Sequence, residues 1–188
     1  MPGLMVHLIT AKKVRPDADL DFYIASIAPD AVQGWHKKDK THYRDLHDRT
    51  EAIMKLAKNT DKSNSFEEGM LLHLFLDWKW DISVRDEYIK NTGGDWYLTY
   101  RDEIRRVSAN LYHNTPWAHE LWKLMDEYDL TKCGNIPGAT TQELKELISE
   151  NRVWHDENNV GPSLLYPPEF IEEFTDRVAR EFISFRSP

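Results

Sequence analysis

Apolar residues recur along this chain at every third or fourth position, and few segments alternate strictly between apolar and polar residues. This spacing gathers apolar side chains on one face of an α-helix and therefore predicts a mainly helical protein. The pattern is clearest in Phe174, Val178 and Phe182, which follow two consecutive prolines suited to a helix start. Patterns of this kind predict about seven helices, which fall within residues 4–14, 46–57, 64–78, 104–111, 117–124, 144–148 and 170–182.

A second well-marked helix is expected to begin at Asn64. Asn64 and Glu67 have the spacing of a capping box, in which each side chain satisfies a free backbone amide of the other residue. Helical spacing then places four large apolar residues on one stripe, namely Phe66, Met70, Leu74 and Trp78.

Glycine and proline interrupt the helical patterns at residues 91–94, 133–138, 161–162 and 167–168. Both residue types disturb helical hydrogen bonding, so these segments are predicted to be loops. No repeat of solenoid length is present, and no segment has the composition of a domain linker. We therefore expect one compact all-α domain over residues 1–188, long enough to bury a substantial core.

Charge and composition exclude several classes of protein. The chain has 24 Lys and Arg against 32 Asp and Glu, a net charge of −8, which argues against binding to nucleic acid or to an anionic membrane. A single cysteine, Cys133, excludes a disulfide framework. Met1 is not followed by a basic and then apolar segment, and no apolar run reaches the roughly 18 residues of a spanning helix. We expect a soluble protein in a reduced, cytoplasmic compartment.

Candidate chemistry lies in the central helix. His73 and Asp77 are four residues apart within an otherwise apolar segment, so they project from one face of the helix at a spacing that can chelate a metal ion. Gly69 lies one turn earlier and is predicted to leave open space beside the imidazole, at a cost of about 1 kcal/mol in helix propensity. A buried His–Asp hydrogen bond and an exposed helical pair are the alternative interpretations.

Three further polar residues lie nearer the N-terminus, and each has an alternative interpretation. His7 interrupts the apolar segment 4–9, where a core histidine bonded to a carbonyl would also fit. Asp30 follows Pro29 and is suited to capping a helix as well as to binding metal. His42 follows a lysine-rich turn, where an exposed histidine is the ordinary expectation.

Taken in order, these residues resemble the zinc-dependent phospholipase C family, in its short, cysteine-poor bacterial branch. The resemblance spans roughly the first 80 residues, and the remainder of the chain is similar only in being helical and rich in aromatic residues. The matching features are His7, the turn Ala28-Pro29-Asp30-Ala31, the segment Lys40-Thr41-His42-Tyr43, and Gly69-x-x-x-His73-x-x-x-Asp77.

The resemblance implies an all-α fold around a buried metal site that hydrolyses a small-molecule or lipid phosphoester, with a metal-activated water as nucleophile. It implies that one metal is surrounded by Asp30, His42, His73 and Asp77. His7 would bind a second metal, with Asp77 as a bridge, and Asp30 would be the general base. Imidazole and carboxylate ligands suit one or two zinc ions, and iron or manganese would also be accepted.

Two other interpretations stay open at this point. His47-Asp48 is similar to the metal-binding dipeptide of HD-domain phosphohydrolases, whose other ligands would come from His36 or His42 and from Asp77. His36 could also replace His42 as a ligand in the first interpretation. Alternatively, the protein is non-catalytic, and the same residues hold a structural metal or form a buried polar network.

Overall fold

The computed structural model describes residues 1–94 and 96–187, and these residues form helices and loops without a β-strand. This confirms the all-α class. The α-helices are α1 (Leu4–Val14), α2 (Leu20–Ala25), α3 (Trp35–Thr41), α4 (Arg49–Asn59), α5 (Ser65–Trp80), α6 (Asp86–Thr92), α7 (Tyr97–Asn114), α8 (Ala118–Glu127), α9 (Thr141–Glu157) and α10 (Pro168–Arg186). Shorter helical segments are η1 (Ala28–Ala31), η2 (Asp81–Arg85) and η3 (Leu130–Lys132).

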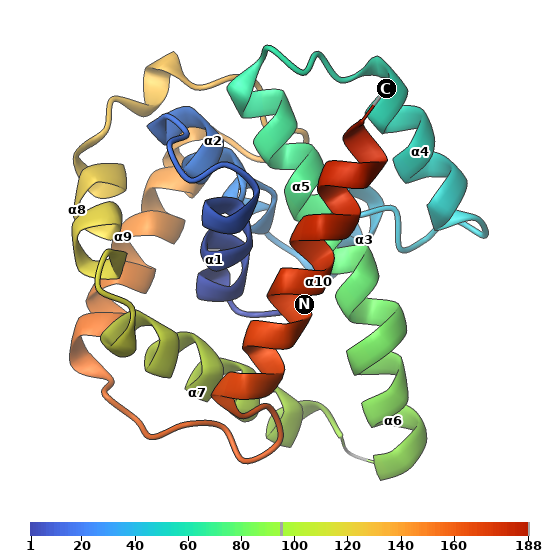
Figure 1. Cartoon of the computed structure of the whole chain (residues 1–188), viewed down its shortest axis with the longest axis vertical. Helices are drawn as coiled ribbons and strands as arrows, with labels where there is room; N and C mark the ends of the chain where they lie inside the picture. Colours follow the sequence, from blue (N-terminus) through green and yellow to red (C-terminus); the bar gives the residue numbers. More distant parts are fainter. Residues whose placement is uncertain (95, 188) are drawn as a thin grey trace.

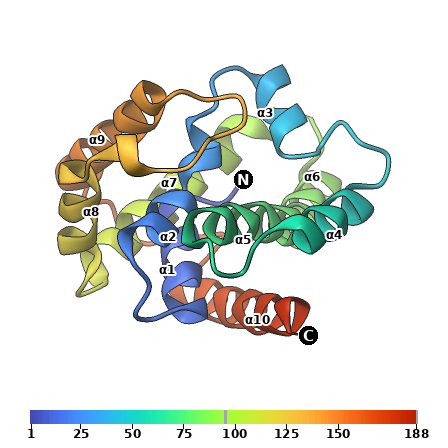
Figure 2. The same ribbon diagram turned by 90° about the horizontal axis from the view of Figure 1, so that it is seen from above.

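Helix α5 lies at the centre of the domain, with α2 packed along it and α10 crossing beside α1 (Figures 1 and 2). Apolar residues surround α5 on most sides, and Leu71, Leu72 and Leu76 are at most 1% exposed. Its polar residues His73 and Asp77 are therefore enclosed by protein. No helix among the described residues is both long enough and apolar enough to cross a membrane.

Each of the seven segments predicted to be helical overlaps a helix of the structure, although residues 46–48, 64 and 117 lie just before α4, α5 and α8. The sequence patterns missed α2, α3 and α6, which have only six or seven residues and are too short to show a helical period. Helix α3 buries none of its residues, so it has no apolar stripe to detect.

The starts of α5 and α9 show how side chains define these boundaries. The Asn64 side chain accepts hydrogen bonds from the backbone amides of Phe66 and Glu67, as predicted. Glu67 differs from the prediction, because its carboxylate accepts from the Asn64 side-chain amide and from the Asp61 backbone. A complete capping box is formed instead by Thr140 and Glu143 at the start of α9.

The prediction of open space beside Gly69 is wrong. A Cβ atom at this position would lie 2.5 Å from the carbonyl oxygen of Phe22 and 2.7 Å from the Cβ of Ala25. Glycine is needed because the backbone of α2 lies directly against α5 here. The close contact also brings the end of α2, including Ser26, next to His73.

Candidate metal centre

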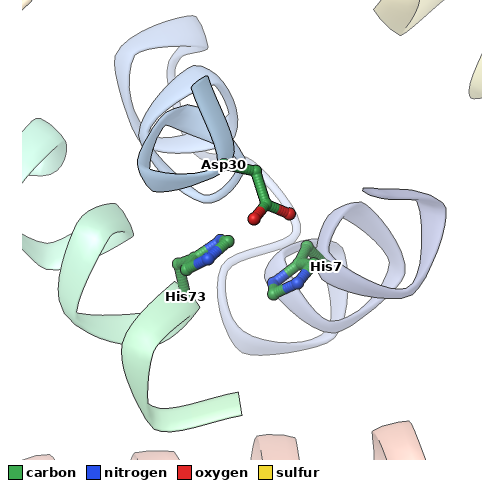
Figure 3. Close-up of side chains that lie close together, drawn as sticks. All are labelled: His7, Asp30 and His73. Atoms are coloured by element: carbon green, nitrogen blue, oxygen red, sulfur yellow. The ribbon is translucent and has the colours of Figure 1, made fainter. Parts of the chain in front are cut away.

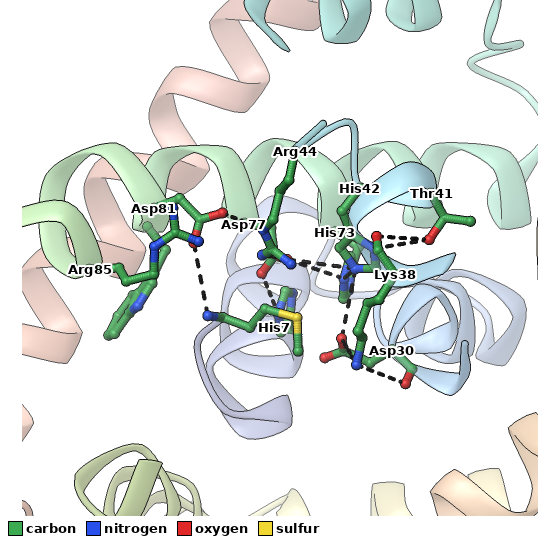
Figure 4. A network of polar contacts seen from close by, with 12 residues as sticks. His7, Asp30, Lys38, Thr41, His42, Arg44, His73, Asp77, Asp81 and Arg85 are labelled. Atoms are coloured by element: carbon green, nitrogen blue, oxygen red, sulfur yellow. Dashed lines mark hydrogen bonds and ion pairs between the residues drawn. The ribbon is translucent and has the colours of Figure 1, made fainter. Parts of the chain in front are cut away.

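The structure brings all five residues predicted as metal ligands to one buried place. His7 comes from α1, Asp30 from η1, His42 from the end of α3, and His73 and Asp77 from α5 (Figures 3 and 4). Asp30 is 7% exposed and the other four are at most 1% exposed. Two groups have ligand atoms that all lie within 4.8 Å of one another and could hold a metal ion: His42, His73 and Asp77, and His7, Asp30 and His73.

The backbone at the end of α3 turns two side chains toward the buried cluster of histidine and aspartate. Tyr43 has a φ of 57°, in the left-handed region that costs a non-glycine residue about 1–2 kcal/mol. Its neighbours His42 and Arg44 both reach the cluster (Figure 4). A strained residue between two side chains of one site is typical of functional loops.

Backbone carbonyls determine which ring nitrogens of His42 and His73 are free. Nδ1 of His42 lies 2.8 Å from the carbonyl oxygen of Lys38, and Nδ1 of His73 lies 2.9 Å from that of Ser26. A carbonyl oxygen only accepts hydrogen bonds, so each Nδ1 carries the proton and each Nε2 of the neutral ring has a lone pair. Metal-binding histidines are commonly oriented by a carbonyl in this way.

The two free nitrogens face each other. Nε2 of His42 lies 3.2 Å from Nε2 of His73, and their rings are inclined at 72°. Oδ2 of Asp77 lies 3.6 Å from the first nitrogen and 3.9 Å from the second. Two lone pairs at this separation repel unless a proton or a cation lies between them. Burial lowers the pKa of His73 to about 3, which disfavours a second proton on that ring, at Nε2.

His7 is placed differently from the other two histidines. Its ring stacks on that of His73 at 4.1 Å and 8°, and parallel rings cannot both direct an in-plane lone pair at one ion. Neither ring nitrogen of His7 has a hydrogen-bond partner among the described residues, and Nε2 lies 3.5 Å from Oδ1 of Asp77. His42, His73 and Asp77 are therefore the better-formed group, and His7 is suited to a second position beside Asp77.

Charged side chains hold the carboxylates of the cluster ionised. Burial by itself would raise the pKa of Asp30, but Lys38 at 2.9 Å and His42 hold it well below its usual value. Burial would likewise raise the pKa of Asp77, but Arg44 at 2.7 Å and the neighbouring histidines together hold it well below its usual value. The alternative role of Asp30 as a helix cap is wrong, because its carboxylate faces the cluster (Figure 3).

A second group of charged side chains, centred on Asp81, lies next to Asp77 and is joined to it by Arg44. Arg44 also donates to Asp81, and Asp81 pairs with Arg85 at 3.0 Å (Figure 4). Asp81 in addition accepts from Arg49 at 2.7 Å. The sequence interpretation missed this group, together with Lys38. The spacing of four residues that joins His73 to Asp77 continues to Asp81 and Arg85 and could have revealed it.

The HD-domain interpretation does not fit the structure. His47 and Asp48 are both exposed, and Asp48 caps α4 by accepting from the backbone amide of Glu51 at 2.9 Å. His36 is also exposed, so it does not replace His42. Neither His36 nor His47 belongs to a potential metal-binding group of the described residues.

His155 lies on a cavity that reaches the cluster. This cavity of about 220 Å³ is also lined by Asp30, Lys38, Arg105 and Ser108. The Ser108 hydroxyl lies 2.9 Å from Nε2 of His155. Asp30 is the only one of the five cluster residues on this lining, so the cavity approaches the cluster from the side of Asp30.

We expect the metal-free protein to lose stability as the pH falls below about 6.5. Burial lowers the pKa of His73 to about 3 and that of His155 to about 4, whereas unfolded histidine titrates near pH 6.5. At a pH between the folded and the unfolded pKa, these two histidines bind protons in the unfolded chain but not in the folded chain. The free energy of unfolding should therefore fall by up to about 1.4 kcal/mol per pH unit for each of these histidines.

Urea denaturation of the metal-free protein at about pH 7, 6 and 5 measures this slope. His155→Gln should make the slope shallower, because one of the two buried imidazoles is then absent. A free energy of unfolding that is constant or rises toward pH 5 would contradict the prediction.

No protein-family model matches the chain, and comparison with curated proteins and with solved structures finds no significant similarity. The fold and the site therefore define the class by themselves: an all-α protein with a buried cluster of histidine and aspartate that could hold a metal ion.

Proposed function

We propose that this protein is a metal-dependent hydrolase of phosphoester bonds and that residues 1–188 form one domain similar to zinc-dependent phospholipase C. In this proposal His42, His73 and Asp77 bind one metal ion, and His7 and Asp30 complete the centre. The supporting observation is the pair of Nε2 lone pairs that face each other across 3.2 Å beside an ionised carboxylate. A cation between them removes the repulsion and the cost of burying the carboxylate.

The ligand chemistry favours zinc. Imidazole nitrogen and carboxylate oxygen are common zinc ligands, and three protein ligands with a remaining open position are typical of catalytic zinc sites. Iron and manganese also accept this mixture of ligands, so they are the alternatives. The geometry of His7 supports a second ion, and we propose one or two ions in total.

When bound, zinc lowers the pKa of water in its coordination shell to about 7 and so supplies hydroxide at neutral pH. Asp30 is the proposed general base, because its carboxylate is ionised at neutral pH and can accept a proton. It also borders the cavity that approaches the cluster, where a water molecule can reach it. Lys38 orients the Asp30 carboxylate from 2.9 Å.

The charges around the cluster favour an anionic substrate. Three carboxylates, those of Asp30, Asp77 and Asp81, are surrounded by four cationic side chains, those of Lys38, Arg44, Arg49 and Arg85. A divalent ion adds further positive charge to a chain whose net charge is −8. Phosphoesters are anions that arginine, lysine and zinc all bind. With the resemblance of residues 7–77 to phospholipase C, this supports a small-molecule or lipid phosphoester as substrate.

A non-catalytic structural metal site is the second candidate. The observation in its favour is that His42, His73 and Asp77 are completely buried. Structural zinc sites are closed by four protein ligands, whereas catalytic sites keep one position for water or substrate. The two candidates therefore differ in whether the bound metal reaches solvent.

The test combines metal content with hydrolysis. Untagged protein purified without chelators should contain about one or two equivalents of zinc, iron or manganese by inductively coupled plasma mass spectrometry. It should hydrolyse bis(4-nitrophenyl) phosphate or a glycerophospholipid, lose this activity to a chelator, and regain it with the metal. Protein that binds no added metal would contradict the proposal, and protein that binds metal but hydrolyses no phosphoester would support the structural site.

A further inference from the structure

A second cavity, named the Trp35 cavity after one of its lining residues, lies beside the cluster and differs in character from the first. It measures about 260 Å³ and includes Arg44, whose guanidinium group donates to Asp77 at 2.7 Å. It adjoins the cavity at Asp30, since Pro2 and Ile104 line both. A molecule in the Trp35 cavity would therefore lie one side chain away from the proposed metal ligands.

Aromatic side chains form one wall of this cavity. The ring of Tyr97 makes edge contacts with Trp35 at 5.7 Å and with Trp96 at 5.8 Å between centroids. Trp35 is 64% exposed, although tryptophan is usually well buried in a folded protein. An exposed tryptophan beside other rings at the mouth of a cavity is suited to stacking against a flat ligand.

Arginine side chains make the rest of the cavity lining positively charged. Arg44, Arg85 and Arg101 all line it, whereas Asp39 is the one carboxylate among its lining residues. The guanidinium of Arg101 lies over the Tyr97 ring, 5.9 Å from its centroid, so a cation is placed next to the aromatic wall. Arg44 and Arg85 also pair with Asp77 and Asp81. Arginine binds phosphate through paired hydrogen bonds, so Arg101 in particular favours an anion that carries a ring.

The neighbouring cavities lack this combination. A larger cavity of about 410 Å³, behind Thr41 and Tyr43, has a mostly apolar lining without arginine. The cavity at Asp30 contains a single tryptophan, Trp154, and a single arginine, Arg105. Only the Trp35 cavity, among these three, joins several rings to several guanidinium groups.

We infer that the Trp35 cavity binds a phosphate ester whose organic group is a planar aromatic ring, with the ring against Trp35 and Tyr97 and the phosphate toward Arg101. Helix α3 connects this cavity to the cluster, because Trp35 begins the helix and His42 directly follows its last residue. The identification of this ligand as the substrate rests on the proposed function, but its binding does not.

Binding to metal-free protein tests the inference without any turnover. Phenyl phosphate and glycerol 2-phosphate carry the same phosphate group, and only the first has a ring. Titration calorimetry should show that phenyl phosphate binds at least about tenfold more tightly, which is within the range of stacking on one aromatic side chain. Trp35→Leu should remove this preference, and Arg101→Gln should weaken the binding of both compounds.

Trp117→Leu is the matched control, because Trp117 is partly buried and lines neither this cavity nor the one at Asp30. It should keep the preference for phenyl phosphate. Trp35→Leu should fold, since α3 buries none of its residues. Equal binding of the two compounds, binding of neither, or an unchanged preference in Trp35→Leu would each overturn the inference.

The experiments distinguish failure of the proposed hydrolase function from failure of the inferred ligand of the Trp35 cavity. If no phosphoester is hydrolysed but Trp35→Leu abolishes the preference for phenyl phosphate, the inference stands and the proposed function is wrong. If the metal-loaded protein hydrolyses phosphoesters but binds ring-bearing and ring-free phosphates equally, the proposed function stands and the inference is wrong.

Discussion

Asp77→Asn is expected to remove bound metal and phosphoester hydrolysis together while leaving the helical fold in place. The change takes away the anionic ligand between His42 and His73 but keeps the shape of the side chain. Arg44 retains its bond to Asp81 at 2.7 Å, so it does not become an unpaired buried charge. Metal affinity should fall by more than ~100-fold, since loss of an outer supporting group alone costs about 10- to 100-fold.

Metal content after dialysis, activity and far-ultraviolet circular dichroism measure these effects in one preparation. His73→Ala should give the same loss of metal, with an additional cost of about 2 kcal/mol in stability from the cavity that it leaves in the core. His47→Ala is the control, because His47 is exposed and outside the cluster. Full metal occupancy in both Asp77→Asn and His73→Ala would show that these residues are not ligands.

Gly69→Ala is expected to destabilise the protein, although alanine favours a helix by about 1 kcal/mol over glycine. The new methyl group would lie 2.5 Å from the Phe22 carbonyl oxygen and 2.7 Å from the Ala25 Cβ, so α2 has to move away from α5. Overpacking against backbone costs about 3 kcal/mol, which leaves a net loss of about 2 kcal/mol. For 188 residues this corresponds to a Tm lower by about 4–8 °C.

Thermal unfolding of the metal-free protein measures this change. The same movement displaces the Ser26 carbonyl that orients His73, so metal affinity should also decrease. Gly161→Ala is the matched control: nothing lies within 4 Å of its added Cβ, so its Tm should stay the same or rise. A Tm of Gly69→Ala equal to or above that of the unchanged protein would show that α2 and α5 do not need this glycine.

The candidate site could be predicted in part from local spacing. His73 and Asp77 share a helix, and their enclosure by leucines indicated that both point into the protein. His7, Asp30 and His42 were added by the resemblance to phospholipase C, and the structure places them beside this pair. Binding of metal by these five residues stays a prediction, which the Asp77→Asn experiment tests.

Unlike Asp81 and Arg85, the supporting cations Lys38 and Arg44 could not be found from local spacing. Lys38 and Arg44 lie in a polar segment that has the composition of an exposed turn, and the structure makes them partners of Asp30 and Asp77. Such ion pairs join residues that are far apart in the sequence, and no local period marks them. Helix α3 was missed for a related reason, since it is positioned by these polar contacts and not by a buried apolar face.

The sequence by itself determined that this protein is helical and where its longer helices lie, because helical hydrogen bonds and apolar stripes connect residues only three or four positions apart. Only the tertiary structure decided which nitrogen atoms of the histidines are free and that two of them meet. The Lys38 and Ser26 carbonyls orient the rings, and Ser26 reaches His73 only because Gly69 lets two helices touch. These contacts depend on packing between distant segments, which local sequence patterns do not record.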